Sequence, residues 1–146
     1  MLRHHLPQVL VVDDDASLRD LLRTILEAEG YPVLQAADGL DALAILHTAP
    51  SPLVMLSNHQ MPRLDGPGLF ARILADPLLP ARHAYLYMTA MPWAILPAFA
   101  RQLAALQVQV VWKPFDVAEL LAAIAAAASR LSSAPPPSRT PAGSRS

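Results

Sequence analysis

Short apolar segments separated by longer segments with helical patterns are the feature that most constrains the fold of this chain. Three of the apolar runs show almost no polar alternation, at residues 8–13, 53–57 and 83–88. Two further candidate runs lie at residues 33–36 and 108–112. Runs of this length are typical of strands buried on both faces of a parallel sheet. The sequence therefore predicts five buried strands.

Helical patterns fill the segments between these strands. Asp38 precedes one helix, Asp116 and Glu119 form a start resembling a capping box for the last one, and Gly30 stands where the first should end. Pro97 fits the first turn of a shortened helix within residues 91–106. The first helix is expected to present one apolar face, made of Leu18, Leu21, Leu22, Ile25 and Leu26.

Alternating strands and helices imply right-handed crossovers, so we expect an α/β, doubly wound parallel sheet with helices on both faces. Ligand sites in such folds lie at the carboxyl ends of the strands. The marked polar residues of this chain all fall there. Asp13 and Asp14 end the first strand, Asn58 ends the third, Thr89 the fourth and Lys113 the fifth.

Length and composition indicate one domain. A chain of 146 residues with 53% apolar composition can bury a single sizeable core. We expect that domain to span residues 8–131, after an N-terminal leader of residues 1–7. Residues 132–146 are rich in Pro and Ser and lack large apolar side chains, so we expect them to be disordered.

Charge and residue usage exclude several classes of partner. Formal net charge is -1, with 11 basic and 12 acidic residues, which argues against direct nucleic-acid binding. Without cysteine there is no disulfide framework, and no apolar stretch is long enough for a membrane span. A cytoplasmic protein is the simplest expectation. Lys113 is the only lysine among the 11 basic residues, which suggests a specific task.

Several short motifs accompany the polar residues at the strand ends. They are the acidic run at residues 13–15, Met61-Pro62, Asp65-Gly66, Thr89-Ala90 and Lys113-Pro114-Phe115. In this order and spacing they resemble the receiver domain of two-component response regulators, over residues 8–131. The resemblance implies the flavodoxin-like strand order 2-1-3-4-5 and a cis bond before Pro114.

The same resemblance assigns roles residue by residue. The acidic pair of the family falls on Asp13 and Asp14, its switch hydroxyl on Thr89 and its phosphate-sensing lysine on Lys113. Its phosphoacceptor aspartate, four residues before the Pro of Met-Pro, falls on Asn58. Asp15 is interpreted as the start of a helix, where an acid complements the helix dipole.

Asn58 changes the chemistry of this site. An aspartate attacks phosphorus through an anionic oxygen, whereas the amide oxygen of Asn58 is neutral, so aspartyl phosphate cannot form there. Carboxylates are hard ligands that suit Mg²⁺, and Asp14 is the best candidate for direct ligation, with Asp13 and Gln60 beside it. Loss of the third carboxylate predicts a weak Mg²⁺ site, and no cofactor is expected to be required.

A second departure concerns the switch aromatic of the family, three positions before the lysine. Val110 stands there, and strand alternation puts Trp112 on the same side, where it either takes over part of that surface or caps the hydrophobic edge. Asp65-Gly66 is interpreted as a turn in which Gly66 supplies backbone freedom. His59 is expected to be exposed and chemically inert.

The leading hypothesis is a pseudo-receiver that is not an enzyme and acts as a protein-protein interaction module. Its partner would be a histidine kinase, a phosphotransfer protein or an output protein, with a homodimer left open. One alternative is a conventional phosphorylatable receiver carrying an engineered Asp to Asn change at position 58. Another is a phosphatase resembling the haloacid dehalogenases, with Asp13 as nucleophile, Asp15 as acid/base, and Thr89 and Lys113 binding phosphate.

Overall fold

Five parallel strands form one sheet in the order β2-β1-β3-β4-β5. The structure, a computed structural model, describes residues 6–133. The strands are β1 (Val9–Val12), β2 (Val33–Ala36), β3 (Val54–Asn58), β4 (Ala84–Thr89) and β5 (Gln109–Trp112). Strand order and parallel pairing confirm the doubly wound fold expected from the sequence.

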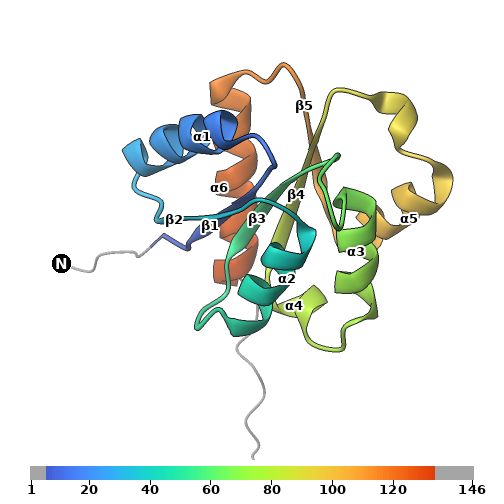
Figure 1. The fold of residues 1–146 in the computed structure, drawn as a ribbon. Helices are drawn as coiled ribbons and strands as arrows, with labels where there is room; N and C mark the ends of the chain where they lie inside the picture. The colour runs from blue at the N-terminus through green and yellow to red at the C-terminus, as the bar shows by residue number, and fades with distance from the viewer. Residues whose placement is uncertain (1–5, 134–146) are drawn as a thin grey trace, which may run out of the picture.

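Helices cover both faces of the sheet (Figure 1). One face carries α1 (Ala16–Ala28) and α6 (Val117–Ser133). The other carries α2 (Gly39–Thr48), α3 (Gly66–Ala75) and α5 (Pro97–Ala105). Two short helices complete the described chain, α4 (Leu79–Arg82) and the 3₁₀ helix η1 (Pro92–Ala94).

Two cores, one on each face, explain why the strand sequences do not alternate. Successive side chains of a strand point to opposite faces of the sheet. In β1, Val9 and Val11 enter the core beneath α1 and α6, whereas Leu10 and Val12 enter the core beneath α2, α3 and α5. All four are 0% exposed, so both faces require apolar residues.

Helix α1 begins at the predicted Asp15 cap, but its apolar face is narrower than expected. Asp15 accepts hydrogen bonds from the backbone N–H groups of Ser17 and Leu18, at 2.9 and 3.2 Å. Leu22 and Leu26 are fully buried, whereas Leu21 is 52% exposed. The predicted five-residue face is therefore wrong at Leu21, because the buried stripe of α1 follows the spacing i, i+4.

Asp65-Gly66, interpreted from the sequence as a turn, is the start of α3. Asp65 caps this helix by accepting the Gly68 N–H at 2.9 Å, and Gly66 is its first residue. Gly66 has no positive φ, so backbone freedom is not its role. A Cβ at Gly66 would instead lie 2.8 Å from the backbone oxygen of Asn58, so close packing against the end of β3 requires glycine.

The expected domain ends can be compared with the described residues only in part. Helix α6 includes Ser132 and Ser133, two residues past the expected boundary at residue 131. The remainder of the predicted disordered tail and most of the predicted leader lie outside the described residues. Within residues 6–133, no helix is both long enough and apolar enough to cross a membrane.

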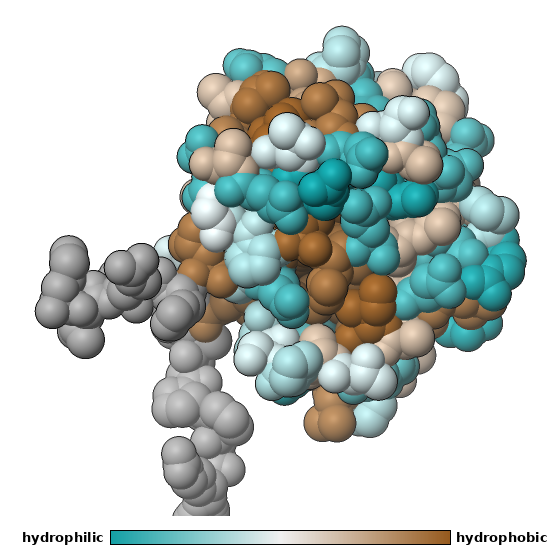
Figure 2. Space-filling model, turned by 60° about the vertical axis from the view of Figure 1, so that its left-hand side comes forward, coloured by the Kyte–Doolittle hydropathy of each residue, from teal (hydrophilic) through white to brown (hydrophobic). Residues whose placement is uncertain are grey.

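Apolar side chains also reach the surface in separate places. Figure 2 shows brown patches between polar residues on one face of the molecule. Across the described residues the exposed large apolar side chains are Leu6, Leu21, Leu40, Leu78, Trp93, Leu96, Trp112 and Val117. Trp93 and Leu96 are the most exposed of those near α5, at 74% and 64%.

A buried histidine predicts how stability should depend on pH. His83 is 4% exposed, its Nδ1 accepts the Leu53 N–H at 3.0 Å, and its Nε2 lies 2.9 Å from the Leu46 carbonyl oxygen. Burial lowers the pKa of His83 below its ordinary 6.5, so the unfolded chain takes up this proton first. The free energy of unfolding should therefore fall as pH drops through 6.5 towards the lower folded-state pKa.

Urea unfolding between pH 7.5 and 5.5, followed by circular dichroism, measures this dependence. His83→Gln, which has no ionisable group, should show a shallower fall in unfolding free energy over the same pH range. Equal pH slopes in the two proteins would show that His83 is not the responsible group.

Candidate functional site

The side chains of Asp13, Asn58 and Lys113 meet at the carboxyl edge of the sheet. Lys113 follows β5, and its backbone N–H donates to the Thr89 carbonyl at 2.9 Å, which continues the β4–β5 pairing beyond Trp112. The Lys113 Nζ donates to the Asn58 Oδ1 at 2.8 Å and lies 4.0 Å from the Asp13 Oδ2. The peptide bond between Lys113 and Pro114 is cis, as the family resemblance implied.

Both ends of the Asn58 amide are hydrogen-bonded. The Asn58 Oδ1 accepts from Lys113, and the Asn58 Nδ2 donates to the backbone oxygen of Gln60 at 3.0 Å. An amide can do both because it carries a donor and an acceptor, whereas an ionised carboxylate only accepts. The sequence prediction placed Gln60 near a metal, and its carbonyl oxygen is engaged here by the Asn58 amide.

Asp13 is the most buried carboxylate of the site, with 1% of the residue exposed. Its Oδ1 accepts the Asp15 N–H at 2.9 Å, while its Oδ2 is buried without a hydrogen-bond partner in the described part of the chain. Burial raises the pKa of Asp13, against the lowering effects of the Asp15 N–H and the Lys113 charge. Asp14, by contrast, is exposed.

An oxygen such as the Asp13 Oδ2, which is buried without a hydrogen-bond partner among the described residues, suits a hard cation. Two features limit that fit. The third oxygen ligand would be the neutral Oδ1 of Asn58. The Nδ2 of Asn58 already donates a hydrogen bond to the Gln60 carbonyl oxygen. Residues 6–133 contain no group of three or more His, Cys, Asp or Glu side chains that could hold a metal ion.

Thr89 lies at the site but its hydroxyl is turned to the following loop. The residue is 1% exposed, and its Oγ1 accepts the Met91 N–H at 3.1 Å. Thr89 is therefore close to Lys113 through the backbone, without a hydrogen bond between their side chains. Its assignment as the switch hydroxyl stays a prediction.

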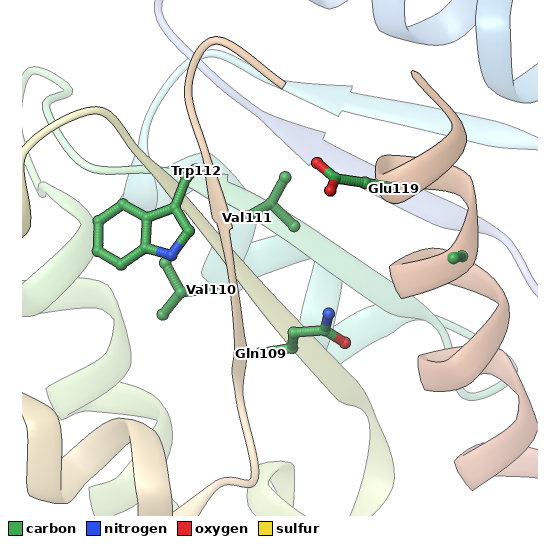
Figure 3. A pocket seen from close by; sticks show the side chains of 6 residues that line it. Gln109, Val110, Val111, Trp112 and Glu119 are labelled. Carbon is green, nitrogen blue, oxygen red and sulfur yellow. The ribbon is translucent and has the colours of Figure 1, made fainter. Parts of the chain in front are cut away.

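Val110 and Trp112 lie on the same side of β5, as strand alternation predicted (Figure 3). Val110 packs against the core on the α5 side, whereas Trp112 is 47% exposed. On the other side of β5, Gln109 and Glu119 line a shallow pocket of about 300 Å³ between β5 and α6. The polar residues around Asn58 do not line this pocket.

His59, expected to be exposed and inert, is half-buried and hydrogen-bonded. Its Nδ1 is paired with the hydroxyl of Tyr87, and the two rings meet edge to face with centroids 5.7 Å apart. The expected exposure was wrong, because the loop after β3 packs against Tyr87 of β4, whereas the chemical inertness of His59 stays a prediction. Tyr87 lies two residues before Thr89 on the same side of β4, a spacing that could have suggested it as a site neighbour.

An ion pair that the sequence analysis did not predict, between Arg63 and Asp38, holds the C-terminal end of the loop between β3 and α3. The Arg63 Nε and Nη2 donate to the two carboxylate oxygens of Asp38 at 2.6 and 3.0 Å, and Nη2 also reaches the Asp41 Oδ1 at 2.9 Å. Arg63 adopts a φ of 63° and holds the pKa of Asp38 below its ordinary value. Such forked pairs are geometrically specific, so the loop is fixed against the start of α2.

The chain is similar to known proteins along most of its described length. The family model described as the response regulator receiver domain matches residues 9–125. The chain is 42% identical over 73 residues to the probable transcriptional regulator ycf27 of Guillardia theta, a match that covers 50% of this chain and 28% of that protein. The chain thus spans under a third of the length of this curated relative.

Solved structures agree along most of the chain. The signal receiver domain of an HD domain-containing protein from Pseudomonas fluorescens Pf-5 superposes with a TM-score of 0.76 at 27% identity, covering 91% of this chain and 94% of that one. The chemotaxis protein CheY4 of Vibrio cholerae superposes with a TM-score of 0.69 at 27% identity, covering 84% of this chain and 98% of that one.

Proposed function

Because the chain belongs to the response regulator receiver domain family, we propose that it serves two-component signal transduction as a receiver that works without phosphorylation. The observation that carries this proposal is the 2.8 Å hydrogen bond from the Lys113 Nζ to the Asn58 Oδ1. A lysine that would neutralise a phosphoryl oxygen is bonded instead to the neutral side chain at the acceptor position.

The amide at position 58 blocks the reaction at its first step. Phosphoryl transfer to a receiver needs an anionic oxygen as nucleophile, and the Asn58 Oδ1 carries no full charge. The Asn58 Nδ2 also donates to the Gln60 oxygen, so the side chain is held from both ends. These contacts favour one state of the site that requires no covalent change.

A receiver held in one state would act through protein contacts, controlled by its abundance or by its partner. A histidine kinase, a phosphotransfer protein or an output protein are the proposed partners, in the cytoplasm. The curated relative is named as a transcriptional regulator, and the match covers only 28% of its length. A net charge of -1 favours protein over nucleic acid as the direct partner of this domain.

Mg²⁺ is proposed to bind weakly, without being required. Asp14 and Asp13 would supply carboxylate oxygens, and the Asp13 Oδ2, which has no hydrogen-bond partner within residues 6–133, is the atom that a cation would contact. A bound cation would supply charge neutralisation for phosphate oxygens. Lys113, which is 4.0 Å from the Asp13 Oδ2, already balances part of that negative charge.

Incubation with acetyl phosphate or phosphoramidate and Mg²⁺, followed by intact mass spectrometry, tests the proposal. We expect no phosphoryl gain on the wild-type protein, because Asn58 has no anionic nucleophile. A stoichiometric gain of one phosphoryl group on the wild-type protein would overturn the proposal.

Asn58→Asp is the matched control for this experiment. It restores the carboxylate at the end of β3 and should become phosphorylated under the same conditions. If the variant is phosphorylated and the wild type is not, the loss of phosphorylation in the wild type is due to the side chain at position 58. If neither protein is modified, the remaining site residues, rather than Asn58 alone, prevent the reaction, and the proposal that Asn58 is the cause fails.

A further inference from the structure

Tyr87 lies at the centre of the core on the α5 side and contacts two helices. It is fully buried on β4, and its register partner in β5 is Val110. Its ring meets Phe99 of α5 at a centroid distance of 5.1 Å and 90°, and Phe70 of α3 at 6.0 Å and 82°. Perpendicular contacts of this kind are favourable aromatic geometries.

The hydroxyl of Tyr87 extends this contact to the polar site. It is hydrogen-bonded to the Nδ1 of His59, the residue that follows Asn58. Burial raises the pKa of Tyr87 to about 12, so the phenol is neutral near pH 7 and can donate. Val110 lies beside Tyr87 in the sheet but has no polar atom, so β5 cannot make the same link at this position.

The loop between β3 and α3 is thus attached at two separate places. Near its end, Arg63 pairs with Asp38, and the Leu64 carbonyl accepts the Gly39 N–H at 3.0 Å. Near its beginning, His59 is attached to Tyr87. The first attachment connects the loop to α2, and the second connects it, through the Tyr87 ring, to α5.

We propose that Tyr87 is a positioning residue that couples the loop after Asn58 to helix α5 and holds both in one arrangement. The coupling runs from His59 through the phenol hydroxyl, and from the phenol ring to Phe99. It also fixes the start of α5, where the exposed Trp93 and Leu96 precede the helix. This role goes beyond the proposed absence of phosphorylation, because no part of it involves the acceptor side chain.

Tyr87→Phe tests the coupling because it removes only the hydroxyl and keeps the ring against Phe99. Amide hydrogen exchange measured by mass spectrometry should become about fivefold faster in both segments, residues 59–65 and 97–105, as expected for one lost net hydrogen bond. Faster exchange in the loop alone would overturn the proposal, since the hydroxyl would then not position α5.

Tyr85→Phe is the matched control on the same strand. Tyr85 is equally buried and packs on Phe70, but its hydroxyl donates to the Leu79 carbonyl oxygen at 2.5 Å. Its loss should speed exchange near residues 79–82 and leave residues 97–105 at the wild-type rate. If the two variants give the same pattern, the effect is a general loss of stability and the positioning role is refuted.

His59→Ala approaches the same link from the loop. It should reproduce the faster exchange of residues 97–105, although His59 has no ring contact with Phe99 among the aromatic pairs of the described residues. Unchanged exchange in α5 would contradict the proposal. This variant carries the test alone if Tyr87→Phe does not fold, because His59 is a half-buried loop residue.

Discussion

Replacing Asn58 by aspartate is expected to raise the affinity for Mg²⁺ about thirtyfold. One added negative charge attracts a divalent ion by roughly 2 kcal/mol at ~4 Å in bulk-water dielectric, which is about thirtyfold in affinity. The substitution also removes the Nδ2 donor that holds the Gln60 oxygen in the wild type. A third carboxylate oxygen and a released carbonyl then join Asp13 and Asp14, a donor set that Mg²⁺ prefers.

Isothermal titration calorimetry at constant ionic strength measures this gain, because salt screens exposed charges. Asn58→Ala is the control, since it frees the Gln60 oxygen without adding charge. Its affinity should stay near the wild-type value if charge is decisive. An alanine variant that binds Mg²⁺ as tightly as the aspartate variant would show that the amide blocks the site sterically or by hydrogen bonding.

Substituting Gly39 by alanine should destabilise the fold by about 1–3 kcal/mol, the usual cost of overpacking. A Cβ at Gly39 would lie 2.5 Å from the backbone oxygen of Leu64 and 2.9 Å from its Cβ. Neither atom can move without displacing the loop between β3 and α3. The same displacement would weaken the 3.0 Å hydrogen bond from the Gly39 N–H to the Leu64 oxygen.

Gly68→Ala is a stringent control, because its added Cβ would also meet Leu64, but at a side-chain atom that can move rather than at the backbone. It would lie 2.7 Å from the Leu64 Cδ1, the far end of a flexible side chain. Gly68 is inside α3, where alanine gains roughly 0.5–1 kcal/mol over glycine, so the net change should be small. Urea denaturation compares the two variants, and equal midpoints would refute the distinction between backbone and side-chain contacts.

Local sequence patterns predicted the strands well and one helix poorly. The five apolar runs became the five strands. The central strands β1, β3 and β4 are buried because helices cover both faces of the sheet, whereas the edge strands β2 and β5 are partly exposed, so the prediction of five buried strands was wrong for these two. Helix α3 was not anticipated, since its first residues, Gly66, Pro67 and Gly68, resemble a turn. Its start depends on the Asp65 cap and on the close approach of Gly66 to Asn58.

The contacts that hold the loop after Asn58 join residues distant in the chain. His59 and Tyr87 are 28 residues apart, and Arg63 and Asp38 are 25 apart. No helical or strand period relates such pairs, so sequence patterns could not predict them. This is why His59 was expected to be exposed and why Arg63 was not identified.

The sequence by itself determined the chemistry at position 58, because the absence of an anionic oxygen is a property of the amide and not of its surroundings. Only the tertiary structure decided which groups that amide contacts. It brought the Lys113 Nζ to 2.8 Å from the Asn58 Oδ1, left the Asp13 Oδ2 without a hydrogen-bond partner in the described chain, and turned the Thr89 hydroxyl to the Met91 N–H. The physical reason is that the identity of a residue fixes its charge and its hydrogen-bonding groups. Its partners depend on which distant segments of the chain pack next to it.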